Sequence, residues 1–306
     1  GSWFVDALGW RSAFLVHLPF GGIALVRALL LRVDTERRET APLPDLLGMV
    51  LIGIFLGATA LVLSQGRSWG WVDGRVLAAS AVALVTAPVL IWRCRHHPSP
   101  VVDLAIFRRT TYRRVTVLAV VLPAGIFANY TMFPQFLGRV WHYDTFGVGM
   151  AIVPFSVGAS IAAVIVSRAS KRVDERLLLF GGMVTMIVAV LFLRFVPTED
   201  ASYWTSYFPA VVLSGVGGWG VGLSMINGIG ARDLDDTNYG VGVAILMTAR
   251  QCGSLAGVAT AFGILGDTSM TGSEALSQLH EVWTLLLVVF VVAALLALRI
   301  PRRVRP

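Results

Sequence analysis

Nine apolar stretches, most of them about twenty residues long, fill the greater part of this chain. A helix of about 20 apolar residues crosses a hydrocarbon core of roughly 30 Å. None of the stretches contains an aspartate or a glutamate, and buried charges are costly in a bilayer. The pattern predicts an all-α integral membrane protein with nine transmembrane helices. The predicted spans are residues 14–31, 46–63, 76–92, 115–138, 146–166, 177–196, 207–230, 241–266 and 282–298.

Positive residues are distributed unevenly over the gaps between these stretches. Alternate gaps hold 18 of the 25 lysines and arginines, the remaining gaps hold 4, and 3 lie inside spans. Short loops rich in lysine and arginine stay in the cytoplasm. We therefore expect a multi-pass protein of the cell membrane whose amino terminus lies outside and whose carboxyl terminus is cytoplasmic.

Composition excludes several other classes of protein. With 56% hydrophobic and 14% charged residues, the chain is no soluble domain. Cytoplasmic loops that face anionic lipid account for the net charge of +7, so the expected partner is the bilayer and not a nucleic acid. Cys94 and Cys252 lie on parts of the chain unsuited to a disulfide and lack metal-ligand spacing. We expect no metal, no cofactor and no enzymatic activity, since no acid pair or nucleophile–base spacing occurs.

The spacing of the spans divides the chain into three regions. Residues 1–43 hold a lone helix and a charged loop, and residues 44–114 hold a helix pair followed by a cytoplasmic linker with six arginines. Residues 115–306 hold six helices with short connections and a basic tail. Six helices that can split three and three make up one half of many transporter folds.

Four short motifs carry a resemblance to a known family. Residues 9–19 (GWRSAFLVHLP) resemble a G-W-R-x-x-F-x-x-N-x-P helix entry, with His17 in place of the asparagine. Residues 66–71 are similar to a G-x-S-W-G-W outer loop, and residues 103–108 to a D-L-x-x-F-R helix entry. Residues 248–253 (TARQCG) resemble a T-A-R-Q-x-G element. In this order the motifs are typical of the fourteen-span drug:proton antiporters of the major facilitator superfamily.

The resemblance implies a major facilitator fold in which the nine helices correspond to helices six to fourteen: the end of the first half, a two-helix insert and a complete second half. It implies proton-coupled efflux of drugs or other small molecules. The family's first five helices, with their antiporter motif, have no counterpart here, so we expect a truncated gene, one half of a split transporter or a shortened chain. The alternative is a non-transporting membrane remnant, or a subunit that needs a second chain.

Polar residues inside the spans are the candidates for substrate binding or coupling. Arg250 lies near the predicted midplane, and small residues follow on its helical face, which favours a packed neighbour over an open cavity. A structural role in an ion pair or carbonyl clamp and a role in coupling both stay open for it. Its neighbour Gln251 belongs to the same motif, and Asn129, Gln135 and Asn227 are uncharged polar residues in other spans. Each of these three suits either an interhelical hydrogen bond or a ligand contact.

An arginine-rich loop and a glycine-rich segment each allow a specific functional interpretation and an ordinary structural one. The loop that contains Arg168, Arg172 and Arg176 resembles the superfamily's G-x-L-x-D-R-x-G-x-R loop, which implies a latch of the inward-closed state; Lys171 stands at the aspartate position. The same loop also serves simply as a positive anchor. Residues 215–220 match G-x-G-x-x-G but lie inside a span, so we expect helix packing and no dinucleotide site.

Overall fold

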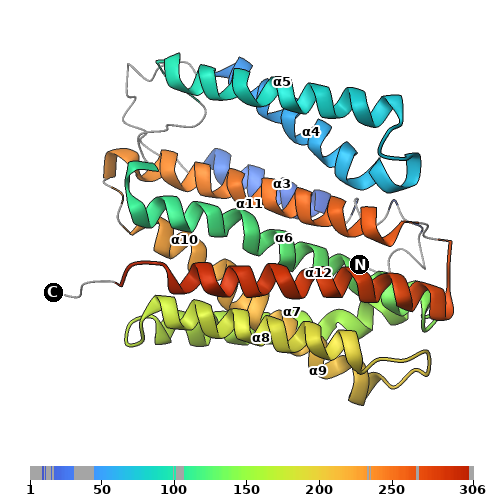
Figure 1. Cartoon of the computed structure of the whole chain (residues 1–306). Helices are drawn as coiled ribbons and strands as arrows, with labels where there is room; N and C mark the ends of the chain where they lie inside the picture. The colour runs from blue at the N-terminus through green and yellow to red at the C-terminus, as the bar shows by residue number, and fades with distance from the viewer. Residues whose placement is uncertain are drawn as a thin grey trace.

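The computed structural model describes residues 9, 11, 15, 17–30, 45–98, 100, 107–232, 234, 236–266 and 269–302. Within them the chain is all-helical, and each of the nine predicted stretches coincides with a helix (Figure 1). Seven of the helices are long and apolar enough to cross a membrane. The helices are α3 (His17–Leu30), α4 (Leu46–Trp69), α5 (Gly74–His96), α6 (Thr110–Arg139), α7 (Thr145–Ala169), α8 (Glu175–Phe195), the continuous rod η2 (Tyr203–Tyr207), α9 (Phe208–Ser214), η3 (Gly215–Leu223) and α10 (Ser224–Ala231), then α11 (Asp236–Leu265) and α12 (Gly272–Leu298).

Aspartates begin four of these helices. The side chains of Asp45, Asp73, Asp144 and Asp174 accept hydrogen bonds from backbone N–H groups in the first turns of α4, α5, α7 and α8. A capping carboxylate satisfies a donor that the helix leaves open and favours the positive end of its dipole. Four of the 18 acidic residues of the chain therefore define where helices start.

A six-helix block forms the centre of the molecule, and its most buried spans are the rod of η2 to α10, with 61% of its apolar window buried, and α6, with 56%. α6 packs against α11 on one side and α12 on the other, α8 packs against α12, and α7 packs against the rod of η2 to α10 (Figure 1). The tyrosine Tyr112 of α6 is fully buried and donates a hydrogen bond to the carbonyl oxygen of Gly242 in α11, at 2.8 Å. These contacts hold the six helices side by side with their axes roughly aligned.

Glycines set how closely the helices approach. Gly253 and Gly257 of α11 face α6, where a Cβ at either position would overlap the carbonyl oxygens of Val120 and Ala124. The expectation that small residues beside Arg250 mark a packed neighbour is thereby confirmed. Residues 215–220 also pack closely: a Cβ at Gly215 would overlap the backbone of Phe155 in α7. The glycines of this segment are packing residues, as predicted.

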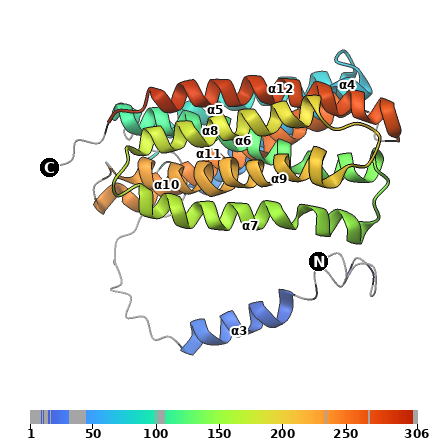
Figure 2. The ribbon, with the colours of Figure 1, turned by 90° about the horizontal axis from the view of Figure 1, so that it is seen from below.

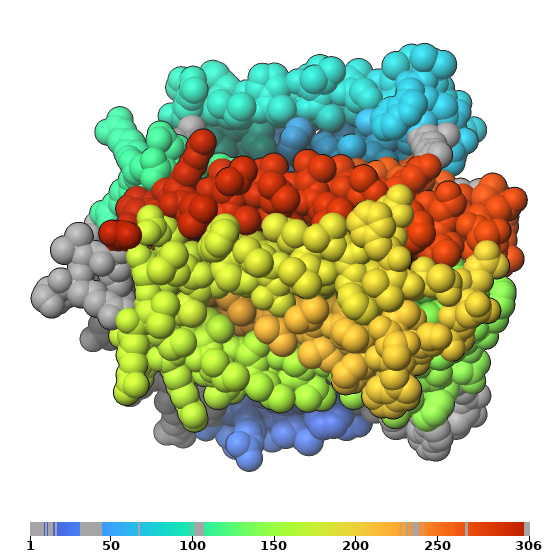
Figure 3. Space-filling model, turned by 60° about the horizontal axis from the view of Figure 1, so that its bottom comes forward, coloured from blue at the N-terminus to red at the C-terminus, as the bar shows by residue number. Residues whose placement is uncertain are grey.

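The helix pair α4–α5 lies at the edge of the block. α4 packs on α5 and on α11, and Figure 3 shows the pair standing apart from α12 with a hollow between them. α3 lies outside the bundle in Figure 2, and its described residues are all exposed.

Two helix boundaries differ most from the sequence-based expectation. The predicted outer loop at 66–71 is helical as far as Trp69, because Gly66 leaves room for the ring of Trp71 to fold back against α4. α12 begins ten residues before its predicted span, at Gly272, so that it includes Glu274 and Glu281. Its first turns are polar enough to lie outside the hydrocarbon, where hydropathy gives no signal.

Candidate functional site

The basic residues of alternate loops come together at one end of the bundle. Asp45 begins α4 there, Arg93 ends α5, Arg232 follows α10 and Arg299 follows α12. Arg93 contacts Asp45 at 2.7 Å, and Arg114 of α6 donates to the carbonyl oxygen of Arg299. The uneven distribution of charge along the sequence is therefore an uneven distribution between two ends in space.

An ion-pair network at this end joins α8 to the end of α10 and to the residues after α12. Glu175 pairs with Arg232 at 3.0 Å, and Arg232 also donates to the carbonyl oxygen of Pro301 at 3.0 Å. Asp174 lies 3.9 Å from Arg176 and 3.8 Å from Arg302. Both partners of the Glu175–Arg232 pair are mostly buried.

The three predicted latch arginines are placed differently from one another. Arg168 and Arg172 are exposed and, with Lys171, line a shallow hollow at the end of α7. Arg176 is half-buried beside Asp174. The buried pair of this region, Glu175 with Arg232, was not singled out from the sequence, since Arg232 is distant in the chain and no local pattern links the two.

Arg250 lies half-way along the 30-residue helix α11 and is half-buried. Its Nε atom is buried, and in the described part of the chain no group accepts a hydrogen bond from it. The hydroxyl of Ser254 donates to the backbone carbonyl of Arg250 and does not engage the guanidinium. A cation inside the membrane costs free energy, so a mid-span arginine is a candidate functional residue.

The other predicted polar residues do not converge on one point. Asn129 of α6 is 1% exposed and donates to the hydroxyl of Ser214 in α9 at 3.1 Å, while its Oδ1 has no acceptor role among the described residues. Gln135 is half-buried without a hydrogen bond in the described ranges, and Gln251 is exposed. Asn227 belongs to α10, but its side chain lies outside the described residues. Asn129 thus makes the interhelical bond that was one of its two predicted roles.

An aromatic cluster between α6, α7 and η3 was not expected from the sequence. The ring of Trp219 lies 5.3 Å from Phe127, 5.8 Å from Tyr130 and 5.9 Å from Phe155, measured between centroids. Phe127, Tyr130 and Trp219 are half-buried, so the cluster presents ring surface at the edge of the block. Trp219 sits in a π-helical turn, a local geometry that recurs at functional sites. In the sequence, the segment around Trp219 was marked only by its glycines, which predicted helix packing.

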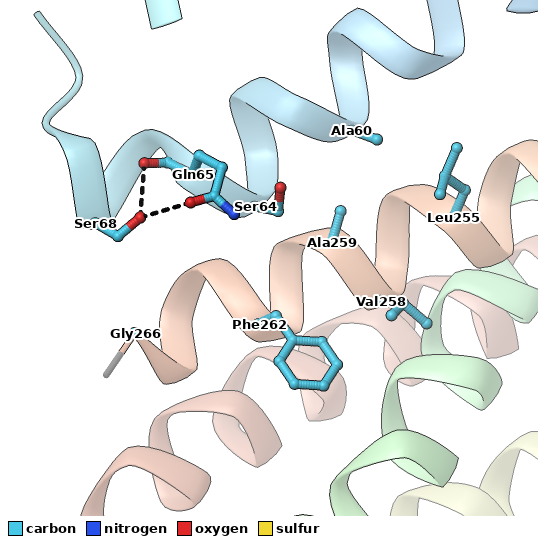
Figure 4. Close-up of a pocket in the computed structure, with 9 residues that line it drawn as sticks. All are labelled: Ala60, Ser64, Gln65, Ser68, Leu255, Val258, Ala259, Phe262 and Gly266. Atoms are coloured by element: carbon cyan, nitrogen blue, oxygen red, sulfur yellow. Dashed lines mark hydrogen bonds between the residues drawn. The ribbon is translucent and has the colours of Figure 1, made fainter. Parts of the chain in front are cut away.

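A hollow of about 500 Å³ separates α4 from α11. One wall consists of Ala60, Ser64, Gln65 and Ser68, and the facing wall of apolar α11 residues, as Figure 4 shows. The hydroxyl of Ser68 donates to the side-chain oxygen of Gln65 at 2.9 Å. An apolar wall on α11 thus faces a few convergent polar groups on α4, a combination that ligand sites share.

The family sequence model described as Major Facilitator Superfamily matches residues 1–258 of the chain and, a second time, residues 115–305. The chain belongs to the major facilitator superfamily. This membership and the seven helices apolar enough to cross a membrane agree with the expectation from the four motifs.

Relatives in this superfamily are similar along most of the chain. Over 284 residues it is 27% identical to the multidrug resistance protein Stp of Mycobacterium tuberculosis, which covers 92% of this chain and 50% of the relative. It is 28% identical over 273 residues to the methylenomycin A resistance protein of Streptomyces coelicolor, covering 88% and 56%. A probable actinorhodin transporter of the same organism is 26% identical over 268 residues, covering 85% and 46%. The chain spans about half the length of these relatives.

In this major facilitator chain the motifs that carry the resemblance occupy distinct structural places. The TARQCG element lies at the centre of α11, with its glycine against α6. The outer-loop motif forms the last turn of α4 and the tight connection to α5. Residues 103–106 of the D-L-x-x-F-R motif lie outside the described residues, and so do residues 10, 12–14 and 16 of the motif at 9–19.

Proposed function

We propose that this chain is part of an exporter that moves drugs or similar small molecules out of the cell in exchange for protons. The observation that carries the proposal is the superfamily match along the whole chain, together with relatives named for antibiotic and multidrug resistance. The six-helix block would supply one wall of the transport path, and rocking of that wall against a second half would alternate access.

The aromatic cluster and Arg250 are the proposed working parts of this wall. Trp219, Tyr130 and Phe127 offer flat ring surface, which suits the apolar or cationic aromatic portions of small molecules. The guanidinium of Arg250 needs an anionic or carbonyl partner at mid-span, and the spans predicted here hold no acid. A carboxylate from a further helix would fill that role, and protonation of that carboxylate would release the arginine. Such a pair is a means of coupling transport to protons.

The basic end of the bundle faces the cytoplasm in this proposal. Single cysteines replacing the exposed residues Lys171 and Ala201, in a protein without its two native cysteines, test the orientation in intact cells. A membrane-impermeant thiol reagent should label position 201 and leave position 171 unlabelled until the cells are opened. The reverse pattern would overturn the orientation.

Deletion of the gene in its own host tests the export activity itself. The deletion strain should accumulate more of a fluorescent lipophilic cation than the parent, and an uncoupler should abolish the difference between the strains. Complementation with Arg250→Ala should restore the protein but not the export. Equal accumulation of every tested compound in the parent and the deletion strain would refute the proposal.

A second candidate function rests on the absence of acids from the predicted spans and on the chain's half coverage of its relatives. In that case these 306 residues form a membrane subunit that requires a second chain. A gene encoding only these residues, returned to the deletion strain, separates the two: restored export shows that they suffice, and normal membrane insertion without export shows that they need a partner.

A further inference from the structure

The hollow between α4 and α11 is graded in polarity along the membrane normal. Ala60 of α4 and Leu255 and Ala259 of α11 line its deeper part. Gln65 and Ser68 line the part near the end of α4, where α11 contributes Phe262 and Gly266 (Figure 4). The hollow is therefore apolar in its deeper part and polar at its opening near the end of α4, which we call its mouth. A single membrane leaflet has the same profile, with acyl chains inside and polar groups at the surface.

The length of α4 sets the level of this mouth in the bilayer. The ionised Asp45 and its partner Arg93 mark one membrane surface. Twenty residues of helix rise about 30 Å, which is the thickness of the hydrocarbon core, and twenty residues after Asp45 the helix reaches Gln65. Gln65 and Ser68 therefore lie at the level of the ester groups of the opposite leaflet.

One polar group at the mouth, the side-chain amide nitrogen of Gln65, is a donor in need of an acceptor. Ser68 donates to Gln65, so the side-chain oxygen of Gln65 is occupied, but its amide nitrogen has no partner within the described part of the chain. One helical turn further, Trp69 carries the guanidinium of Arg75 at 5.3 Å from its ring. The Gln65 amide can donate to the ester carbonyl oxygens of a glycerophospholipid, and the Arg75 guanidinium, one turn nearer the surface, can pair with its phosphate.

The surroundings of the hollow also favour a lipid as its occupant. Only 6% of the residues in the apolar window of α4 are fully buried inside the protein, and the others are half-buried or exposed, so the helix borders lipid along its length. Leu255 on the facing wall is 41% exposed, which opens the hollow to that same environment. An apolar space of this size in contact with hydrocarbon fills with acyl chain, because an unfilled space forfeits its dispersion contacts.

We propose that a single glycerophospholipid of the leaflet at the Trp69 end is bound between α4 and α11. Its ester oxygens accept from Gln65, its phosphate lies near Arg75, and one acyl chain runs along Ala60, Leu255 and Ala259. The lipid completes the contact between the helix pair and the six-helix block. The proposal does not depend on the exported substrate.

Photocrosslinking in a reconstituted bilayer tests this site. The chain is placed in nanodiscs of phosphatidylethanolamine and phosphatidylglycerol with a trace of phospholipid that carries a diazirine within its acyl chain. Labelling should concentrate on Ala60, Leu255 and Ala259. Ala60→Leu fills the hollow and should lower this labelling about tenfold, which corresponds to about 1.4 kcal/mol. Ala81→Leu, at an exposed alanine of α5, is the matched control and should leave it unchanged.

A second measurement separates the lipid from other occupants. Native mass spectrometry of the purified chain should show one retained phospholipid that Gln65→Leu loses and Ala81→Leu keeps. Excess lipophilic dye should not displace it. Labelling spread evenly around α4, labelling that persists in Ala60→Leu, or displacement of the lipid by the dye would overturn the proposal.

Discussion

In α4 only 6% of the apolar span is buried inside the protein, whereas in α6 the share is 56%, although α4 is the more apolar of the two helices. In water the more apolar helix would be the more buried one. In a bilayer lipid tails are as apolar as leucine side chains, so apolarity alone draws no helix into the protein. Helices pack where small residues permit close approach and where polar groups find partners.

The contacts of the two regions illustrate this difference. α6 meets α11 across Gly253 and Gly257, and it bonds to α9 through Asn129 and Ser214. Gly53 and Gly57 of α4 have open space around them instead. Gly253 and Gly257 are packing residues in the block, whereas Gly53 and Gly57 face open space in the pair, where Gly66 of α4 packs against Trp71.

The largest effect is expected from filling the α6–α11 contact. Gly253→Leu drives a side chain into the backbone of Val120 and should cost about 3 kcal/mol, with loss of most folded protein. Gly57→Leu places the same side chain in open space and should change stability by less than about 0.5 kcal/mol. The measurement is thermal unfolding in detergent, followed by size-exclusion chromatography. Equal losses in both variants would break the comparison between the two regions.

A smaller effect of opposite sign is expected from Arg250→Leu. Removal of a buried donor without a partner should raise the stability of the chain by about 1–3 kcal/mol, because the desolvation cost of that group disappears. Arg250→Lys keeps the charge and loses the planar fork of donors, so it should not gain this stability. Thermal unfolding compares the variants, and destabilisation by Arg250→Leu would show that the guanidinium clamps a group within the chain.

The interhelical bond of Asn129 should contribute about 1 kcal/mol or less, as such bonds do in membranes. Asn129→Ala should lower the unfolding midpoint slightly through the loss of its bond to Ser214. Gln135→Ala, in the same helix, removes an amide that makes no hydrogen bond with the described residues, and should leave the midpoint unchanged. A larger loss for Gln135 would point to a contact with lipid or ligand.

The smallest expected effect concerns the helix pair and depends on pH. The side-chain hydrogen bond from Arg93 lowers the pKa of Asp45 below its usual 3.8, with a further contribution from the backbone N–H of Gly48. A carboxylate with a lowered pKa stabilises the fold above 3.8, and that contribution is lost as pH falls through the lowered value. Asp45→Asn should therefore melt below the wild type at pH 6 and together with it well below pH 3.8. A gap that widens on acidification would contradict the pairing.

The sequence by itself determined where the helices run and at which end of the bundle the charges gather. Both follow from local quantities, the length of an apolar stretch and the number of arginines in a loop, which do not depend on neighbours. The small-residue packing around Gly253 and residues 215–220 was also predictable, since glycines at these spacings in a span have few other uses.

Only the tertiary structure decided which side chains meet. Glu175 pairs with Arg232, Trp219 joins Tyr130 and Phe155, and α4 meets α11 around a hollow. Each of these contacts joins segments far apart in the chain. Hydropathy cannot distinguish between them, because a bilayer solvates every apolar face equally well and leaves the choice of partner to shape, small residues and hydrogen bonds.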